Sequence, residues 1–280
     1  MPTLIRPPSA KPTKSAFIFI AEIYASESGA GRKARIAASQ HIVMIIIDIV
    51  SIIIYGSAMS YITQRRVEEK ERRRTEILDA AESLYAKEGW DLVTVDQVAR
   101  GARLSRALVY VYFKDKEEIL FAIGERAMAL LRDRFIAASA GQKLGLDKVE
   151  AIGRAYMAYA FEFAHYFDFC AKFHAHSSSP DPGSADLACR EAGDQAIAAV
   201  VQAIECGIAD GSIRPTVGDP MMLAVTLWSF SHGLIQLAMA KGSDMARFGI
   251  GIPDLGNYGF GLLRLMAQNS QVLSMKSKSM

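Results

Sequence analysis

Residues 94–120 decide the fold, and they read Thr94-Val-Asp-Gln-Val-Ala-Arg-Gly-Ala-Arg-Leu-Ser105-Arg-Ala-Leu-Val-Tyr110-Val-Tyr112-Phe113-Lys-Asp-Lys116-Glu-Glu-Ile-Leu120. Thr94 followed three residues later by Gln97 has the pattern of a capping box, which predicts a short helix through Arg100. Residues 101–104 form a turn, and Ser105 is placed to cap a second short helix over 106–111. Two short helices joined by a tight turn predict a helix-turn-helix unit.

The second helix of such a unit enters the major groove of DNA, while the first crosses the phosphate backbone. Helical spacing puts one set of apolar side chains between the two helices: Val95, Val98, Ala99, Leu104, Val109 and Phe113. The remaining side chains of the second helix are then available to DNA, namely Ser105, Arg106, Leu108, Tyr110 and Val111.

Flanking segments support this interpretation. Ile77, Ala80, Ala81, Leu84 and Tyr85 recur at three- and four-residue spacing, which predicts an amphipathic helix, and Gly89 is placed to end it. Asp115, followed by Lys-Glu-Glu, predicts the start of another helix that runs towards Phe135.

Over residues 70–135 the chain resembles the tetracycline-repressor (TetR) family of bacterial regulators. The resemblance rests on the helix ending at Gly89, then Thr-Val-x-x-Val-Ala, then Ser-x-x-x-Val-Tyr-x-Tyr-Phe-x-x-Lys-Glu. A shorter similarity lies in Leu227-Trp228-Ser-Phe-Ser-His232-Gly233-Leu234. The resemblance implies a DNA-binding transcriptional regulator, with repression as the expected sign of regulation.

The resemblance also implies roles for individual residues. Thr94 would cap its helix and contact a phosphate, and Arg106, beside Ser105 at the start of the recognition helix, could read a guanine edge. The hydroxyls of Tyr110 and Tyr112 would contact phosphates. Lys116 would pair with a phosphate at the next helix N-terminus.

Two positions depart from the family pattern. Arg103 stands where the family often has Gly, and a left-handed backbone there would cost on the order of 1 kcal/mol. Arg103 could offset that cost by touching a phosphate. Val111 stands where a polar residue or His is common, and valine can only pack on an apolar group such as the thymine methyl. The operator sequence is therefore not transferable from the family.

The first 58 residues are unlike the rest of the chain. Four prolines lie within residues 2–12, and residues 42–55 form an apolar run interrupted by Asp48. This extension could be a membrane-proximal anchor, an added element packed on the body, or the product of an over-called start before Met59. We favour the over-called start. The following basic residues, 65–74, alternate with glutamates, so they could be either a solvated helix face or an arm that reaches DNA.

Beyond the motif, residues 148–176, 184–209 and 219–241 predict three long helices, with no strand alternation. We therefore predict an all-α fold in which a three-helix DNA-binding domain, residues 59–118, precedes a helical effector-binding and dimerisation domain, residues 119–280. The stripe Ala196, Ile197, Val200, Val201 and Ile204 and the stripe Leu223, Leu227, Phe230, Leu234 and Leu237 could form a two-fold dimer interface or pack within one chain. A two-fold dimer would read a near-palindromic operator.

Aromatic side chains crowd residues 156–173. They could be ordinary core, or they could line a cavity for a small effector that shifts the protein away from its DNA-binding state. The candidate ligand-binding residues are Tyr156, Tyr159, Phe163, Tyr166, Phe167 and Trp228, with His174 and His232 as polar groups.

Composition limits the other function classes. The formal net charge is only +2, so any DNA contact must come from a local patch. Three widely spaced cysteines favour a reduced, cytoplasmic setting, and a metal site at Cys170, His174 and His176 is poorly spaced. No catalytic motif appears, so we expect no enzyme activity, catalytic residue, metal or cofactor. A membrane-tethered regulator using residues 42–55, or a helical small-molecule carrier without DNA function, are the alternatives.

Overall fold

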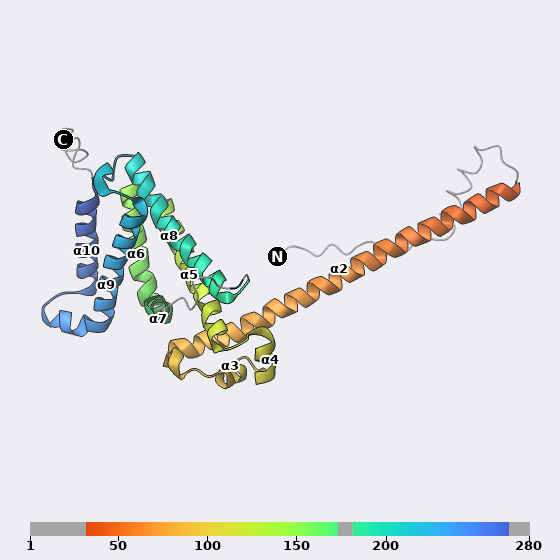
Figure 1. The fold of residues 1–280 in the computed structure, drawn as a ribbon, viewed down its shortest axis with the longest axis horizontal. Coiled ribbons are helices and arrows are strands. Elements are labelled where there is room, and N and C mark those ends of the chain that lie inside the picture. The colour runs from red at the N-terminus through yellow and green to blue at the C-terminus, as the bar shows by residue number, and fades with distance from the viewer. Residues whose placement is uncertain (1–31, 173–180, 182, 269–280) are drawn as a thin grey trace. The chain divides into compact units, whose positions relative to one another are not determined.

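A computed structural model describes residues 32–172, 181 and 183–268 of the chain. The chain forms two compact units, residues 1–73 and 74–280. Helix α2 runs from Arg32 to Glu88 and contributes residues to both units (Figure 1). The predicted domain boundaries at residues 58 and 118 stay predictions.

In the first unit, α2 carries the apolar run 42–55. The side chains described there, Met44, Ile47 and Val50, are exposed. Further along, Glu69 forms ion pairs with Arg72 and Arg73, one helical turn away. These are the pairs expected of a solvated helix face, and they lower the pKa of the Glu69 carboxyl mainly through its hydrogen bond with Arg72.

In the second unit, the end of α2 leads into the motif. A 3₁₀ turn, η1 (Trp90–Leu92), precedes α3 (Val95–Gly101), α4 (Arg106–Tyr112) and α5 (Lys116–Ala140). Gly89 ends α2 with φ of 80° and donates its N–H to the carbonyl of Tyr85 at 3.0 Å. Asp115 caps α5 by accepting from the backbone N–H of Glu118. These helix starts and stops confirm the predicted ones.

The remaining helices are α6 (Gly145–Glu162), α7 (Ala164–Lys172), α8 (Ala185–Ala209), α9 (Pro220–Arg247) and α10 (Ile252–Ala267), with a 3₁₀ turn, η2 (Pro215–Val217), before α9. The helix α5 packs along α8 and α6, while α9 and α10 pack beside α6 (Figure 1). The described residues form no strand beyond the isolated bridge Ile213–Gln268, which confirms the all-α prediction.

The prediction of one helix over 148–176 was wrong. The chain breaks at Phe163, whose φ of −125° and ψ of 63° are not helical. The Phe163 ring packs against Tyr159 and Tyr166, with centroids 5.7 Å away in both cases. No Gly or Pro marks this break in the sequence. Local propensity therefore does not predict it, and the contacts of the Phe163 ring form only in the folded chain.

Two further differences lie near the C-terminus. Helix α9 extends beyond residue 241 to Arg247, with non-helical dihedral angles at Lys241, and α10 was not predicted. Of the two alternatives for the stripe on α8, packing within one chain describes Ala196, Val200 and Ile204, which belong to the core, while Ile197 and Val201 are only partly buried.

One close approach fixes how α6 meets α8. A Cβ added at Gly145 would lie 2.0 Å from the backbone nitrogen of Gly207 and 2.7 Å from the carbonyl oxygen of Ala203. Only glycine fits at the first residue of α6. Oδ2 of Asp210 accepts the Gly145 N–H at 2.7 Å, which holds the end of α8 on the start of α6.

Among the described residues, α9 is long and apolar enough to cross a membrane by length and composition, and 28% of its apolar window is buried within the chain. One such helix is weak support for a membrane span, because core helices pass the same test.

Candidate nucleic-acid interface and effector cavity

Both helices of the motif begin with the predicted caps. The Thr94 hydroxyl accepts from the backbone N–H of Gln97 at 3.3 Å, and Oε1 of Gln97 accepts from the backbone N–H of Thr94 at 2.7 Å. The capping box is complete. Ser105 caps α4 by accepting from the backbone N–H of Leu108 at 3.2 Å. Sequence-local hydrogen bonds therefore set where both helices start.

A small core holds α3 against α4 as predicted. Val98, Ala99, Val109 and Phe113 are buried, and Val95 and Leu104 pack against them partly buried. The Arg74 guanidinium lies 4.5 Å from the centre of the Phe113 ring, and this contact holds the helix-turn-helix against α2.

Most of the predicted DNA-contacting side chains lie on the exposed surface of this unit. Thr94, Arg103, Ser105, Arg106, Tyr110 and Val111 are exposed. Val111 has 73% of its surface accessible, which is unusual for valine and leaves it free to meet an apolar group. Leu108 and Tyr112 are half-buried, so each presents only part of its side chain.

Arg106 is already engaged within the protein. Its Nη1 lies 3.0 Å from Oδ2 of Asp96 on α3, and its Nη2 donates to the Tyr110 hydroxyl at 3.3 Å. These contacts raise the pKa of the Arg106 guanidinium, the hydrogen bond with Tyr110 most of all. Sequence analysis did not single out Asp96, since the ten-residue separation from Arg106 becomes a contact only when α3 and α4 cross.

Arg103 has φ of 57°, the only positive φ found outside glycine among the described residues. The backbone at Arg103 is therefore left-handed, the case in which the sequence analysis expects a cost from a residue other than glycine. The Arg103 N–H donates to the carbonyl of Arg100 at 3.1 Å, and the Leu104 N–H donates to that of Ala99 at 2.9 Å. The turn is tight and its arginine side chain is exposed.

Lys116 was expected to contact a phosphate, but in the structure its ammonium contacts Trp90. Its ammonium donates to the carbonyl oxygen of Trp90 at 2.7 Å and lies 5.0 Å from the centre of the Trp90 ring. The side chain is half-buried. Lys116 thus ties the start of α5 to η1, and a phosphate contact would require it to share or leave this carbonyl.

A cavity of about 490 Å³ lies within the helices of the C-terminal part. Apolar side chains of α5, α6, α8, α9 and α10 form most of its wall, including Leu131, Ile152, Val200, Leu227 and Phe260. Its volume falls within the range of about 300–1,000 Å³ that is usual for small-molecule sites.

The structure brings only part of the predicted ligand set to this cavity. Tyr156 and Trp228 line it. His232 does not line the cavity but contacts Tyr156, with its Nδ1 2.8 Å from the tyrosine oxygen. His174 lies outside the described residues.

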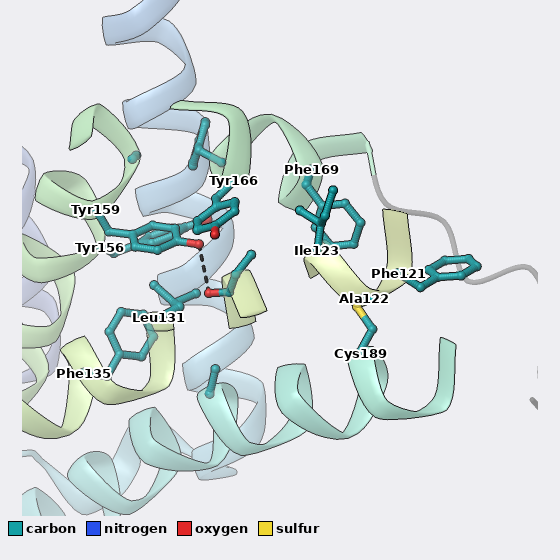
Figure 2. Close-up of a cluster of buried hydrophobic side chains, with 14 of the residues drawn as sticks. Phe121, Ala122, Ile123, Leu131, Phe135, Tyr156, Tyr159, Tyr166, Phe169 and Cys189 are labelled. Carbon is teal, nitrogen blue, oxygen red and sulfur yellow. Dashed lines mark hydrogen bonds between the residues drawn. The ribbon is translucent and has the colours of Figure 1, made fainter. Parts of the chain in front are cut away.

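The other predicted ligand residues are packed elsewhere: Tyr159, Phe163, Tyr166 and Phe167 do not line the cavity. Figure 2 shows Tyr156, Tyr159 and Tyr166 gathered in one cluster, where the Tyr159 hydroxyl donates to the carbonyl of Ala127 at 3.0 Å. Phe167 stacks on His232 with centroids 4.6 Å apart. The core interpretation of these aromatics therefore fits better, because Tyr159, Tyr166 and Phe167 are buried and do not reach the cavity.

Several lining residues were not predicted. Glu150 and Arg264, from α6 and α10, form an ion pair at 2.8 Å, and Arg264 also pairs with Asp147 at 2.7 Å. On α8, Arg190 and Asp194 also line the cavity. The polar residues Arg190 and Asp194 on the mostly apolar helix α8 could have indicated a cavity wall. Arg264 gave no such signal, because residues 252–267 were not recognised as a helix.

Two thiols in the wall are unreactive. Burial raises the pKa of both the Cys170 and the Cys189 thiol to about 12, so neither forms thiolate near neutral pH. The described residues hold no group of His, Cys, Asp or Glu suited to a metal ion.

Helix α7 contacts both the cavity and the end of α2. Phe169 and Cys170 line the cavity, whereas Asp168 accepts a hydrogen bond from the Tyr85 hydroxyl at the end of α2. Glu82 of α2 is hydrogen-bonded to Tyr166 of α7 and to Arg126 of α5, and burial raises the pKa of its carboxyl. The same short helix thus contacts both the cavity and the end of α2, which leads into the helix-turn-helix.

Comparison with known proteins identifies both regions. Residues 77–123 match the family described as bacterial regulatory proteins, tetR family, and residues 149–248 match the tetracyclin repressor-like C-terminal domain. The HTH-type transcriptional regulator HbdR of Aromatoleum sp. (strain CIB) is 40% identical over 65 residues, which is 23% of this chain and 28% of HbdR. The chain thus matches less than a third of that relative's length.

Solved structures share the fold over most of the chain. A protein of unknown function from Rhodococcus sp. RHA1 has a TM-score of 0.59 at 23% identity, covering 70% of this chain and 95% of that one. AibR, solved in complex with isovaleryl coenzyme A and operator DNA, has a TM-score of 0.53 at 17% identity, covering 68% and 97%. With the capped helix-turn-helix and a helical C-terminal domain matched in the same order, the chain belongs to the TetR family of bacterial regulatory proteins.

Proposed function

We propose that this protein is a DNA-binding transcriptional regulator that represses its target genes until a small, mostly apolar effector binds. The observation that carries the proposal is the complete helix-turn-helix, in which caps at Thr94 and Ser105 set two helices over a buried core and leave Arg106, Tyr110 and Val111 exposed. Exposed polar and apolar groups on a rigid short helix are what base reading in the major groove requires.

The remaining DNA contacts are assigned to residues around that helix. Thr94, Arg103, Tyr112 and Lys116 would touch phosphates, and Ser105, Leu108 and Val111 would meet base edges or phosphates beside Arg106. Because the formal net charge is only +2, this patch would supply most of the attraction to DNA.

The cavity supports the effector part of the proposal. Its wall is mostly apolar, and most of its lining residues lie in the region that matches the tetracyclin repressor-like C-terminal domain. AibR, which shares the fold, was solved with an acyl coenzyme A and its operator. A ligand that favours one position of α7 would alter α2 through Tyr85 and Asp168, a population shift of the kind that changes DNA affinity.

A homodimer would pair the exposed apolar faces of α9 and α10 with those of a second copy. Met222, Phe230 and Leu237 of α9 and Leu265 and Met266 of α10 are exposed. Gly233 and Gly261 have open space where a Cβ would stand, which allows helices to approach closely. A two-fold dimer of this kind would read a near-palindromic operator. We place the protein in the cytoplasm, without enzyme activity.

The decisive experiment selects bound duplexes from random DNA and measures binding of the selected sequence by fluorescence anisotropy. Arg106→Ala should weaken binding by about tenfold to a hundredfold and relax preference at one base pair. The matched control is Arg214→Ala, which removes an exposed arginine outside the motif and should leave binding unchanged. Failure to enrich any sequence, or equal effects of the two variants, would reject DNA reading by this helix.

A further inference from the structure

The cavity wall holds a small polar patch on α9 whose hydrogen bonds are incomplete. Ser231 is 5% exposed and lines the cavity. Two other hydroxyls of this helix, at Thr226 and Ser229, donate to carbonyls four residues back at 2.8 Å. The Ser231 hydroxyl makes no hydrogen bond to any residue that the structure describes. A hydroxyl that lines a cavity without a protein partner is available to hydrogen-bond with water or a ligand.

Trp228 stands one turn before Ser231 on the same helix and lines the same cavity. Its Nε1 donates to the Tyr156 hydroxyl at 3.4 Å, a long and weak hydrogen bond. The indole is 48% exposed, so a ligand can cover it. Trp228 therefore offers a donor that a better-placed acceptor can take.

Tyr156 is less available, because its oxygen lies 2.8 Å from Nδ1 of His232. Burial lowers the pKa of His232, which favours a neutral imidazole beside the Tyr156 hydroxyl. Burial also raises the pKa of Tyr156, which stays a phenol. The Tyr156–His232 pair thus holds the Trp228 side of the patch in place and leaves Trp228 and Ser231 as the two uncharged N–H or O–H donors of the described cavity wall.

The charges in the wall are equal in number and opposite in sign. Arg264 is paired with both Asp147 and Glu150. The lining cations, Arg190 and Arg264, are matched in number by the lining anions, Glu150 and Asp194. A buried anionic ligand would have to displace one of these carboxylates or stay unpaired, which is costly.

We infer that the cavity selects an uncharged hydrophobic compound with a carbonyl group, whose oxygen accepts from Nε1 of Trp228 and from the Ser231 hydroxyl while its hydrocarbon body fills the apolar part. A carbonyl oxygen has two lone pairs, which suit two donors. This inference rests on the proposed effector function of the same cavity and specifies the chemistry of its ligand.

The test uses two matched sets of probes with the full-length protein and no DNA, measured by isothermal titration calorimetry. The linear set is methyl laurate, lauryl alcohol and laurate; the aromatic set is acetonaphthone, ethylnaphthalene and naphthoate. In at least one set the carbonyl compound should bind at least about tenfold more tightly than its carboxylate. Equal or tighter binding of the carboxylate, or no binding in either set, would overturn the inference.

Variants test the two donors. Trp228→Phe and Ser231→Ala should each weaken binding of the carbonyl compound by about three- to tenfold and leave ethylnaphthalene within about twofold. Ser229→Ala is the matched control, because its hydroxyl is bonded to the Val225 carbonyl and Ser229 does not line the cavity. Equal effects of Ser231→Ala and Ser229→Ala would exclude Ser231 as a contact.

DNA binding, measured separately, distinguishes this inference from the proposed function. A protein that binds the carbonyl probes and no DNA would remove the regulator proposal and leave the ligand chemistry standing. Selective DNA binding together with a preference for carboxylates would do the reverse.

Discussion

The Tyr85 hydroxyl donates a hydrogen bond of 3.0 Å to Oδ2 of Asp168, joining the end of α2 to α7. Tyr85 is buried among Trp90 and His165, with ring centroids 5.5 Å and 5.9 Å away. Oδ1 of Asp168 also pairs with Lys172 at 2.8 Å. Because α7 contributes Cys170 to the cavity wall, this bond directly connects a helix of the cavity to α2, the helix that leads into the DNA-binding motif.

Removing that bond should weaken the response to an effector. Tyr85→Phe keeps the buried ring and deletes only the hydroxyl, so we expect about 1 kcal/mol less stability in urea denaturation. The ratio of DNA affinities without and with effector should fall by about threefold or more, as measured by anisotropy. Tyr258→Phe, at an exposed tyrosine of α10, is the control. An unchanged ratio in Tyr85→Phe would show that coupling does not pass through this bond.

Loss of the capping box should destabilise the motif. Thr94→Ala removes the side-chain acceptor at the start of α3 and should lower the free energy of unfolding by about 1 kcal/mol, measured by urea denaturation. Thr94→Ser keeps the hydroxyl and should stay close to the original protein. If serine and alanine behave alike, the hydroxyl is not what stabilises this helix start.

Arg103 combines backbone strain with a charge, and two substitutions separate them. Arg103→Gly should stabilise the fold by about 0.5–1 kcal/mol, since glycine adopts φ of 57° without strain. Arg103→Ala keeps the strain and should bring no such gain. Both should reduce the salt dependence of DNA binding by about one phosphate contact. A slope that stays the same in both variants would contradict the phosphate role.

Asp96 holds Arg106 and places a negative charge on the surface proposed to face DNA. Asp96→Asn should free the guanidinium and remove repulsion from phosphates, which raises affinity for random duplexes by about two- to fivefold at low salt. Affinity for the selected operator should rise less, so specificity falls. Asp244→Asn, at an exposed carboxylate of α9, serves for comparison. Lower affinity for random DNA in Asp96→Asn would mean that Asp96 positions Arg106 rather than competing with DNA for it.

The contact between α6 and α8 should not tolerate a side chain at Gly145. Gly145→Ala would place a methyl 2.0 Å from the Gly207 nitrogen, and moving backbone to relieve this should cost at least about 2 kcal/mol of stability. Gly141→Ala, where nothing lies within 4 Å of the added carbon, should change stability little. Thermal unfolding of both variants measures the difference, and equal melting temperatures would show that the helices can separate without loss.

By itself, the sequence determined the features that depend on neighbours along the chain. The caps at Thr94, Ser105 and Asp115 and the end of α2 at Gly89 follow from hydrogen bonds and dihedral preferences within a few residues. The apolar spacing of Val98 and Val109 likewise predicts burial, because each short helix has one face to bury.

Only the tertiary structure decided which aromatic side chains reach the cavity and which charges meet. Helix spacing made Tyr156, Tyr159 and Tyr166 equivalent candidates, yet all three are buried in the core and only Tyr156 also lines the cavity. The contacts of Asp96 with Arg106, and of Tyr85 with Asp168, join residues on different helices. Their formation depends on how helices cross, which is set by the summed packing of many side chains rather than by any local pattern.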